Sequence, residues 1–221
     1  MAGYRDRLRE PATTIWEATF AHPFLRELGA GTLSRERFVY FFRQDYLYLV
    51  DFARALCLGG MKADTMETLE MFARHAATAI QVEQQLHAGF AKRLGLSEEE
   101  LRATPPGPVT KAYTTHLVAT AQTGTLAEIV ACVLPCYWIY WEVGKRLQQC
   151  TPQDPLYVDW IATYGGEEYG AVVEEQLKTV DRLGPSATPS EQTRMQQHFL
   201  LSSRYEYLFW EQAYRLEAWP I

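Results

Sequence analysis

Hydrophobic residues recur along most of the chain at spacings of three and four, which is the spacing of an amphipathic α-helix. Few stretches alternate with a period of two, and none of these is bounded by turn residues as a strand would be. The pattern predicts helices over residues 12–22, 34–61, 65–94, 108–123, 126–149, 155–164, 166–183 and 190–218, with a short helical turn over 97–103. We therefore expect an all-α fold, and the length of several helices is typical of an up-and-down bundle with extra segments.

The breaks between the predicted helices are short. Four glycines fall where a helix would end in a left-handed residue: Gly31, Gly95, Gly124 and Gly184. No break has the length or the composition of an interdomain linker, and no repeat or low-complexity tract occurs. Residues 1–221 are therefore expected to form a single domain.

Composition and charge place the chain among ordinary globular proteins. It has 221 residues, of which 48% are hydrophobic and 22% are charged, and a chain of this length buries roughly 70% of its extended surface. It has 21 lysines and arginines against 27 acidic residues, which gives a net charge of −6. An acidic chain lacks the electrostatic footprint of a protein that binds nucleic acid or a membrane surface, so we expect neither partner.

The N-terminus, the apolar runs and the cysteines indicate a cytoplasmic protein without a metal centre. The first eleven residues are charged and have no signal-peptide pattern. The longest apolar run, Ile129–Trp141, has 13 residues, which is too few to span a bilayer and fits a buried helix. The four cysteines form no CxxC pair and have no histidine at metal-ligand spacing, as is typical of a reduced chain in the cytoplasm.

Asp45 lies at the centre of the aromatic face of the predicted helix over residues 34–61. Phe38, Phe41, Phe42 and Tyr48 share that face in a helical projection. An ionised carboxylate there costs several kcal/mol unless it is paired or hydrogen-bonded. Two interpretations stay open, namely a structural Asp that caps a neighbouring helix or pairs with an Arg, and a carboxylate that faces a ligand.

Cys136 lies at the centre of the apolar face of the predicted helix over residues 126–149, with Tyr140 one turn further on. A cysteine on such a face is usually a small hydrophobic residue. Pro135 favours a second interpretation, because a proline inside a helix displaces the carbonyl four residues earlier and would leave room for a cavity beside the thiol. The alternative is a tolerated bend that accommodates packing.

Glu206 is grouped with apolar and small residues on the predicted helix over residues 190–218. Burial among Met195, Phe199 and Phe209 should raise its pKa, which suits a proton donor near neutral pH. The alternative is a buried, hydrogen-bonded Glu without a chemical role. Three inward-facing reactive groups on three helices, with several tyrosines in the same patterns, together indicate an aromatic-walled pocket.

Several other chemistries are excluded by spacing. A di-iron carboxylate bundle requires Glu three residues before His in two places, and no histidine of this chain has Glu at that position. No GxGxxG, P-loop, HExxH or GxSxG motif occurs either. The sequence therefore predicts neither a cofactor nor a metal.

Three sequence blocks carry a resemblance to a known family. They are FVYFFRQDYLYLVDFARA at 38–55, LPCYWIYWEVG at 134–144 and SSRYEYLFWEQAY at 202–214, supported by HPF at 22–24 and WIATYGGEEYG at 160–170. Along essentially its whole length the chain resembles thiaminase II, the TenA family, in its cysteine-containing branch. The resemblance implies an all-helical bundle of the haem-oxygenase-like type that is usually assembled as a homotetramer.

The same resemblance implies a role for seven residues. The catalytic ones are Cys136 as nucleophile, Glu206 as acid/base and Tyr48 as the tyrosine beside the thiol. The substrate-binding ones are Asp45, which matches the carboxylate that holds the amine and ring nitrogen of an aminopyrimidine, and Tyr140, Tyr164 and Tyr113, which match residues around the ring.

The activity implied by the resemblance is the hydrolysis of 4-amino-5-aminomethyl-2-methylpyrimidine to the hydroxymethyl form and ammonia. This reaction salvages degraded thiamin, and cleavage of thiamin itself is implied as well. Two alternatives stay open. One is a TenA-like protein that acts on, or merely binds, a different pyrimidine, and the other is a cofactorless oxidase of the PQQ-synthesis type.

Overall fold

The computed structural model describes residues 3–221, apart from the side chains of residues 82–88. The described part of the chain contains helices and no strands, so the expected all-α fold is confirmed. The α-helices are α1 (Tyr4–Arg9), α2 (Thr13–Phe20), α3 (Pro23–Ala30), α4 (Arg35–Met61), α5 (Met66–Leu86), α6 (Lys92–Leu94), α7 (Glu98–Arg102), α8 (Pro108–Thr123), α9 (Leu126–Leu147), α10 (Pro155–Gly165), α11 (Glu167–Leu183) and α12 (Pro189–Arg215). A π-helical turn at His87–Ala91 joins α5 to α6, and 3₁₀ turns lie at Glu10–Ala12 and Gly184–Ser186.

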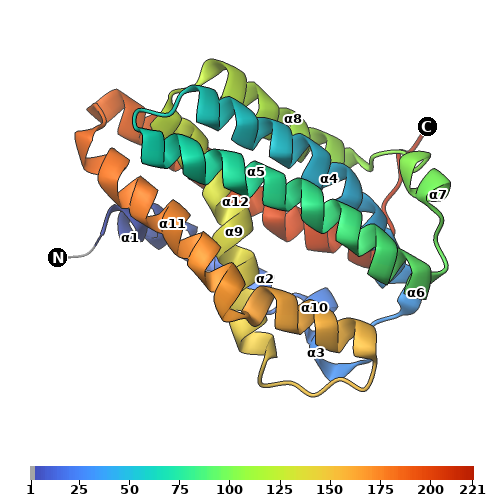
Figure 1. Ribbon diagram of the computed structural model, residues 1–221. Coiled ribbons are helices and arrows are strands. Elements are labelled where there is room, and N and C mark those ends of the chain that lie inside the picture. The colour runs from blue at the N-terminus through green and yellow to red at the C-terminus, as the bar shows by residue number, and fades with distance from the viewer. Residues whose placement is uncertain (1–2) are drawn as a thin grey trace.

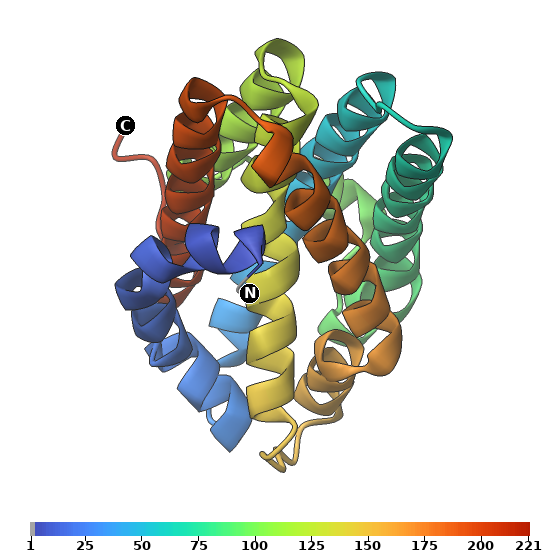
Figure 2. The same cartoon turned by 90° about the vertical axis from the view of Figure 1, so that its left-hand side faces the viewer.

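Helix α9 runs through the middle of the bundle (Figures 1 and 2). It packs against α4, α8, α10, α11 and α12. Buried residues occur on every side of it, as is expected of a helix without a solvent face. Among the described helices, α9 alone is long and apolar enough to cross a membrane by length and composition, but most of it is buried inside the bundle. The prediction that its apolar run forms a buried helix is confirmed.

The largest difference from the predicted helices lies near the N-terminus. The predicted helix over residues 12–22 ends at Phe20, and a helix that the periodicity does not predict, α3, follows almost at once. His22 precedes Pro23, and a residue before proline is driven out of the helical region, here to φ −61° and ψ 136°. Pro23 then fits the first turn of α3, and Nδ1 of His22 accepts a hydrogen bond from the backbone N–H of Phe24 at 3.1 Å.

The four glycines predicted to be left-handed divide into two pairs. Gly31 and Gly95 adopt that conformation, with φ of 72° and 74°. Gly124 is extended and Gly184 is right-handed helical, so those two predictions are wrong. A Cβ at Gly184 would lie 2.2 Å from the ring of Tyr4, which means that close packing, rather than backbone conformation, requires glycine there.

Close backbone contact between α9 and α10 fixes one wall of the site described below. A Cβ at Gly144 of α9 would lie 2.4 Å from the backbone N of Gly165 and the carbonyl carbon of Tyr164, so no other residue fits without moving the backbone. The contact places Tyr164 against Tyr140 of α9, with ring centroids 4.8 Å apart. Helix α9 also continues through Pro135, one residue before Cys136.

Candidate active site

A cavity of about 110 Å³ lies beside Cys136, between α4, α5, α9, α10 and α11. It is lined by Asp45 and Tyr48 from α4, Cys136 and Tyr140 from α9, and Tyr164 from α10. This volume suits one small aromatic ring, since an engineered cavity of roughly 150 Å³ in another protein holds benzene. The structure thus brings five of the seven predicted site residues to one cavity.

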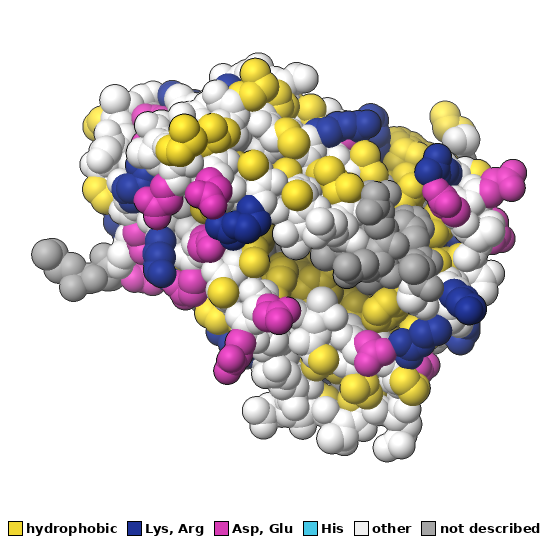
Figure 3. Space-filling view, in the orientation of Figure 1, with side chains coloured by type: hydrophobic (Ala, Val, Ile, Leu, Met, Phe, Trp, Pro, Cys, Tyr) yellow, Lys and Arg dark blue, Asp and Glu magenta, His cyan; other side chains and the backbone are white. Residues whose placement is uncertain are grey.

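The cavity opens between α5 and the junction of α10 with α11. Its lining includes two exposed residues, Thr78 on α5 and Thr163 on α10. The face drawn in Figure 3 has a hollow floored by hydrophobic side chains in this region, and acidic and basic side chains are interspersed around it. A small organic molecule could enter there without crossing a surface of one charge.

Asp45 is buried on α4, and its carboxyl group has no partner in the described part of the chain. Only 6% of its surface is exposed, and the described residues offer its carboxyl group neither a hydrogen bond nor an ion pair. Burial therefore raises its pKa from 3.8 to about 7. A structural Asp would be expected to cap a helix or to pair with an Arg, and neither partner is present in the described part of the chain. The carboxyl group is left facing the cavity.

Cys136 is half-buried, and its raised pKa keeps the thiol protonated. Burial raises its pKa well above the ordinary value, and the nearby carboxyl groups of Glu206 and Asp45 raise it further. The Tyr48 hydroxyl acts in the opposite direction on the thiol, although it makes no hydrogen bond of ordinary geometry within the described residues. A thiolate would therefore need positive charge, or a proton acceptor, to enter with the ligand.

Glu206 and Tyr113 form a hydrogen-bonded pair next to the cavity. The Tyr113 hydroxyl donates to Oε1 of Glu206 at 2.7 Å, and the Tyr113 ring lies 5.0 Å from that of Tyr48. Burial raises the pKa of Glu206 from 4.5 to about 8, the Tyr113 hydrogen bond opposes that rise, and Asp45 adds to it. The upward direction agrees with the expectation from sequence, and it leaves Glu206 protonated at neutral pH.

Three further residues with an ionisable side chain line the cavity and are absent from the predicted site: His75, Tyr137 and Tyr169. Nε2 of His75 lies 2.9 Å from Oε2 of Glu175, and its Nδ1 lies 3.3 Å from the hydroxyl of Tyr137. The sequence points toward two of them, because Tyr137 is adjacent to Cys136 and Tyr169 lies in the sequence block at 160–170. Nothing in the sequence points toward His75, since its position depends on how α5 packs against α4 and α11.

The polar groups of the cavity suit an organic ligand better than a metal ion. Within the described residues, no three metal-ligating side chains converge on it. Six of its fourteen lining residues are Tyr or Phe, and the lining also includes one carboxyl group, one thiol and one imidazole. This arrangement can bind a flat ring by its faces and by one polar edge, with a nucleophile beside it.

Comparison with known proteins assigns the chain to a family. The model of the TENA/THI-4/PQQC family matches residues 9–216. The chain belongs to this family. Aminopyrimidine aminohydrolase from Bacillus subtilis (strain 168) is 41% identical over 216 residues, which cover 98% of this chain and 92% of that protein.

Two further relatives of the TENA/THI-4/PQQC family agree along nearly the whole chain. Aminopyrimidine aminohydrolase from Halalkalibacterium halodurans is 37% identical over 214 residues, which cover 96% of both proteins. The solved structure of a TenA homologue protein from P. horikoshii OT3 superposes with a TM-score of 0.90 at 31% identity, covering 97% of this chain and 99% of that one. The TenA-type helical bundle expected from the sequence is therefore confirmed.

Proposed function

We propose that this protein hydrolyses 4-amino-5-aminomethyl-2-methylpyrimidine to the hydroxymethyl form and ammonia, and that it also cleaves thiamin. The observation that carries the proposal is the carboxyl group of Asp45, which has no partner among the described residues and lines a ring-sized cavity together with the Cys136 thiol. Relatives at 37–41% identity named aminopyrimidine aminohydrolase support it.

Asp45 is the group that would recognise the pyrimidine edge. An aminopyrimidine presents an exocyclic amine next to a ring nitrogen, and one carboxylate can bind both when that nitrogen is protonated. A carboxyl group with a pKa of about 7 can give its proton to the ring and become the carboxylate. Tyr140 and Tyr164 then supply aromatic contact to the ring faces.

Cys136 would supply the covalent step. Its sulfur bonds to a carbon of the protonated, electron-poor ring, and the thiol proton passes to the carboxylate that Asp45 has become, while the ring nitrogen keeps the proton that it received from Asp45. Electrons of the ring then expel the amine from the exocyclic methylene, and Glu206 protonates it to ammonia. Water adds to the methylene carbon and gives its proton to Glu206. The C–S bond then breaks, and the sulfur recovers its proton. The net reaction consumes one water and releases one ammonia.

The protonation state of Glu206 supports its role as the acid. A donor must hold its proton at working pH, and a pKa of about 8 ensures this at neutrality. The Tyr113 hydroxyl, at 2.7 Å, would stabilise the carboxylate that forms after the transfer. The same pair would then accept a proton from the attacking water, which resets the site.

The alternative of a PQQ-type oxidase has little support in the cavity. A large anionic substrate would require several basic side chains, and the described lining contains His75 and no Lys or Arg. A module that only binds a pyrimidine would need neither the buried thiol nor the raised pKa of Glu206.

Turnover of the two substrates tests the proposal. The protein is incubated with the aminomethylpyrimidine and with thiamin, and ammonia and the hydroxymethyl product are quantified. We expect product from the native protein and from Cys57→Ser, a matched control at an exposed thiol. Cys136→Ser should bind the pyrimidine and turn over less than about a tenth as fast, because an alkoxide is far less available than a thiolate. Product formation by Cys136→Ser at the native rate would contradict nucleophilic catalysis.

Homotetrameric assembly and a cytoplasmic location belong to the same proposal. The resemblance to the TenA family supports the tetramer, and four free cysteines support a reducing compartment, where a catalytic thiol survives. Light scattering at micromolar concentration should give a particle four times the mass of the chain. A monomeric mass would contradict the tetramer.

A further inference from the structure

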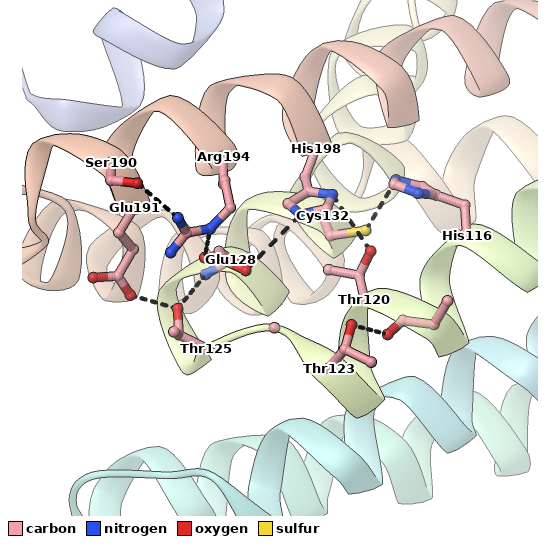
Figure 4. A network of polar contacts seen from close by, with 12 residues as sticks. His116, Thr120, Thr123, Thr125, Glu128, Cys132, Ser190, Glu191, Arg194 and His198 are labelled. Carbon is pink, nitrogen blue, oxygen red and sulfur yellow. Dashed lines mark hydrogen bonds and ion pairs between the residues drawn. The ribbon is translucent and has the colours of Figure 1, made fainter.

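Three metal-ligating side chains converge in the bundle outside the cavity (Figure 4). They are His116 on α8, Cys132 on α9 and His198 on α12, and their ligand atoms all lie within 4.8 Å of one another. We propose that these residues form a binding site for a divalent transition-metal ion of the zinc class, which is independent of the proposed hydrolase activity. Thiolate and imidazole ligands together are a donor set that Zn²⁺ prefers.

The distance between the first two ligands already suits a tetrahedral ion. Zn–S bonds of about 2.3 Å and Zn–N bonds of about 2.0–2.1 Å at a tetrahedral angle place sulfur and nitrogen about 3.6 Å apart. Sγ of Cys132 lies 3.3 Å from Nε2 of His116. The ring centroids of His116 and His198 are 5.4 Å apart, so a small rotation of His198 would complete a three-ligand site. A fourth position is left for water.

A carboxylate is in place to orient one of the imidazoles. Oε2 of Glu128 lies 4.0 Å from Nε2 of His198, and Oε1 of Glu128 accepts a hydrogen bond from Nε of Arg194 at 2.5 Å. Metal-ligating histidines commonly give their second nitrogen to such a carboxylate. Nδ1 of His198, which faces Thr120 at 3.4 Å, is then the nitrogen available to the ion (Figure 4).

The protonation states of the cluster are compatible with metal binding. Burial and the neighbouring His198 lower the pKa of His116 to about 4, so its ring is neutral and its lone pair is free at neutral pH. Burial raises the pKa of Cys132 to about 11, so the thiol is protonated until an ion displaces the proton, as bound metals do. Both histidines are half-buried, which leaves a path for an ion from solvent.

The cluster lies one helical turn from the proposed active site along two of its helices. His116 follows Tyr113 by three residues on α8, and Cys132 precedes Cys136 by four on α9. Helix α12, which carries His198, also carries the proposed acid. A metal ion would therefore join three helices that each carry a proposed active-site residue, namely Tyr113, Cys136 and Glu206, and binding should raise the melting temperature.

Zinc titration of chelator-stripped protein tests the proposal. Zn²⁺ affinity and stoichiometry are measured by competition with a chromophoric chelator, and melting temperature is recorded with and without Zn²⁺. The native protein, Cys57→Ser and Cys136→Ser should each bind one equivalent at the same affinity and melt at a higher temperature when loaded. Cys132→Ser and His198→Gln should bind more than about tenfold more weakly and gain no stability.

Cobalt as a spectroscopic probe identifies the sulfur that binds. The native protein and Cys136→Ser should show a thiolate-to-cobalt absorption band, and Cys132→Ser should not. If Cys132→Ser fails to fold, His198→Gln still tests the proposal, because His198 is only half-buried and its replacement disturbs the core less. Three results would each overturn the proposal and leave the Cys132–His116 contact as packing. They are native Zn²⁺ affinity in Cys132→Ser and His198→Gln, loss of Zn²⁺ binding in Cys136→Ser, and no Zn²⁺ binding by the native protein.

Discussion

Replacing Tyr113 by Phe would change the acidity of Glu206 while leaving the shape of the site almost intact. The substitution removes one hydroxyl, which donates to Oε1 of Glu206 at 2.7 Å. That hydrogen bond is the one described contact that lowers the pKa of Glu206, against burial and the charge of Asp45. Its loss should therefore raise the pKa of Glu206 above the native value of about 8.

The size of the shift follows from the strength of the bond. A hydrogen bond to a charged group contributes about 1.5–3 kcal/mol, and each pKa unit corresponds to about 1.4 kcal/mol, so the pKa of Glu206 should rise by about one to two units. If Glu206 is the acid, activity is lost as pH rises through its pKa. The alkaline limb of the pH profile should then move upward by the same one to two units.

The assay is the pH dependence of kcat/KM for the aminomethylpyrimidine, with ammonia as the measured product. Tyr157→Phe is the matched control, because it removes another buried tyrosine hydroxyl, which donates to the carbonyl of Leu33 at 2.8 Å and does not contact Glu206. Both variants should lose some thermal stability, and only Tyr113→Phe should shift the limb. An alkaline limb that stays in place, or moves to lower pH, would refute the assignment of Glu206 as the acid.

Three other substitutions probe the site and its scaffold. Asp45→Asn should lower kcat/KM by a factor that corresponds to about 3 kcal/mol or more of transition-state stabilisation. It should also melt at a higher temperature than the native protein, by a margin that grows from pH 4 to pH 7, because ionisation of a buried acid with a raised pKa destabilises the native protein as pH rises toward that pKa. Unchanged kinetics would favour the interpretation of Asp45 as a structural residue. Glu206→Gln should lower kcat by roughly 10²–10⁴, less for thiamin than for the aminomethyl substrate, and equal losses on both would place its proton transfer at the ring instead. Gly144→Ala should destabilise the fold by about 1–3 kcal/mol and raise KM, because its Cβ would lie 2.4 Å from the backbone of Gly165. The control Gly60→Ala, whose Cβ would lie 3.5 Å from its nearest neighbour, should leave the melting temperature almost unchanged.

The sequence predicts the helices of the bundle well because their hydrophobic spacing is regular and their breaks carry Gly and Pro. It predicts α3 poorly, since His22 and Pro23 end one helix and begin the next without a loop between them. Burial of Asp45 follows from its aromatic helix face, but the absence of a partner among the described residues depends on neighbouring helices that periodicity does not place.

Residues that meet through tertiary packing are the ones that sequence spacing cannot reveal. His75 reaches the cavity because of the way in which α5 packs. His116, Cys132 and His198 are far apart in the chain, so the search for metal-ligand spacing finds nothing although their side chains converge. A sequence motif can reveal metal ligands only when they share one loop or one helix. In this cluster each of the three candidate ligands lies on a different helix.

The contact at Gly144 has a consequence for how this protein could be re-engineered. Because backbone meets backbone there, the separation of α9 from α10 is set by main-chain atoms and does not change when the tyrosines on either side are replaced. Replacing Tyr164 would alter the polarity and the shape of the cavity wall at that position, but α9 and α10 themselves would stay in place. Room for a bulkier substituent therefore has to come from shorter side chains at other lining positions, such as Leu49, Phe52 and Val172. A screen for variants that accept larger pyrimidines is best directed at those three positions.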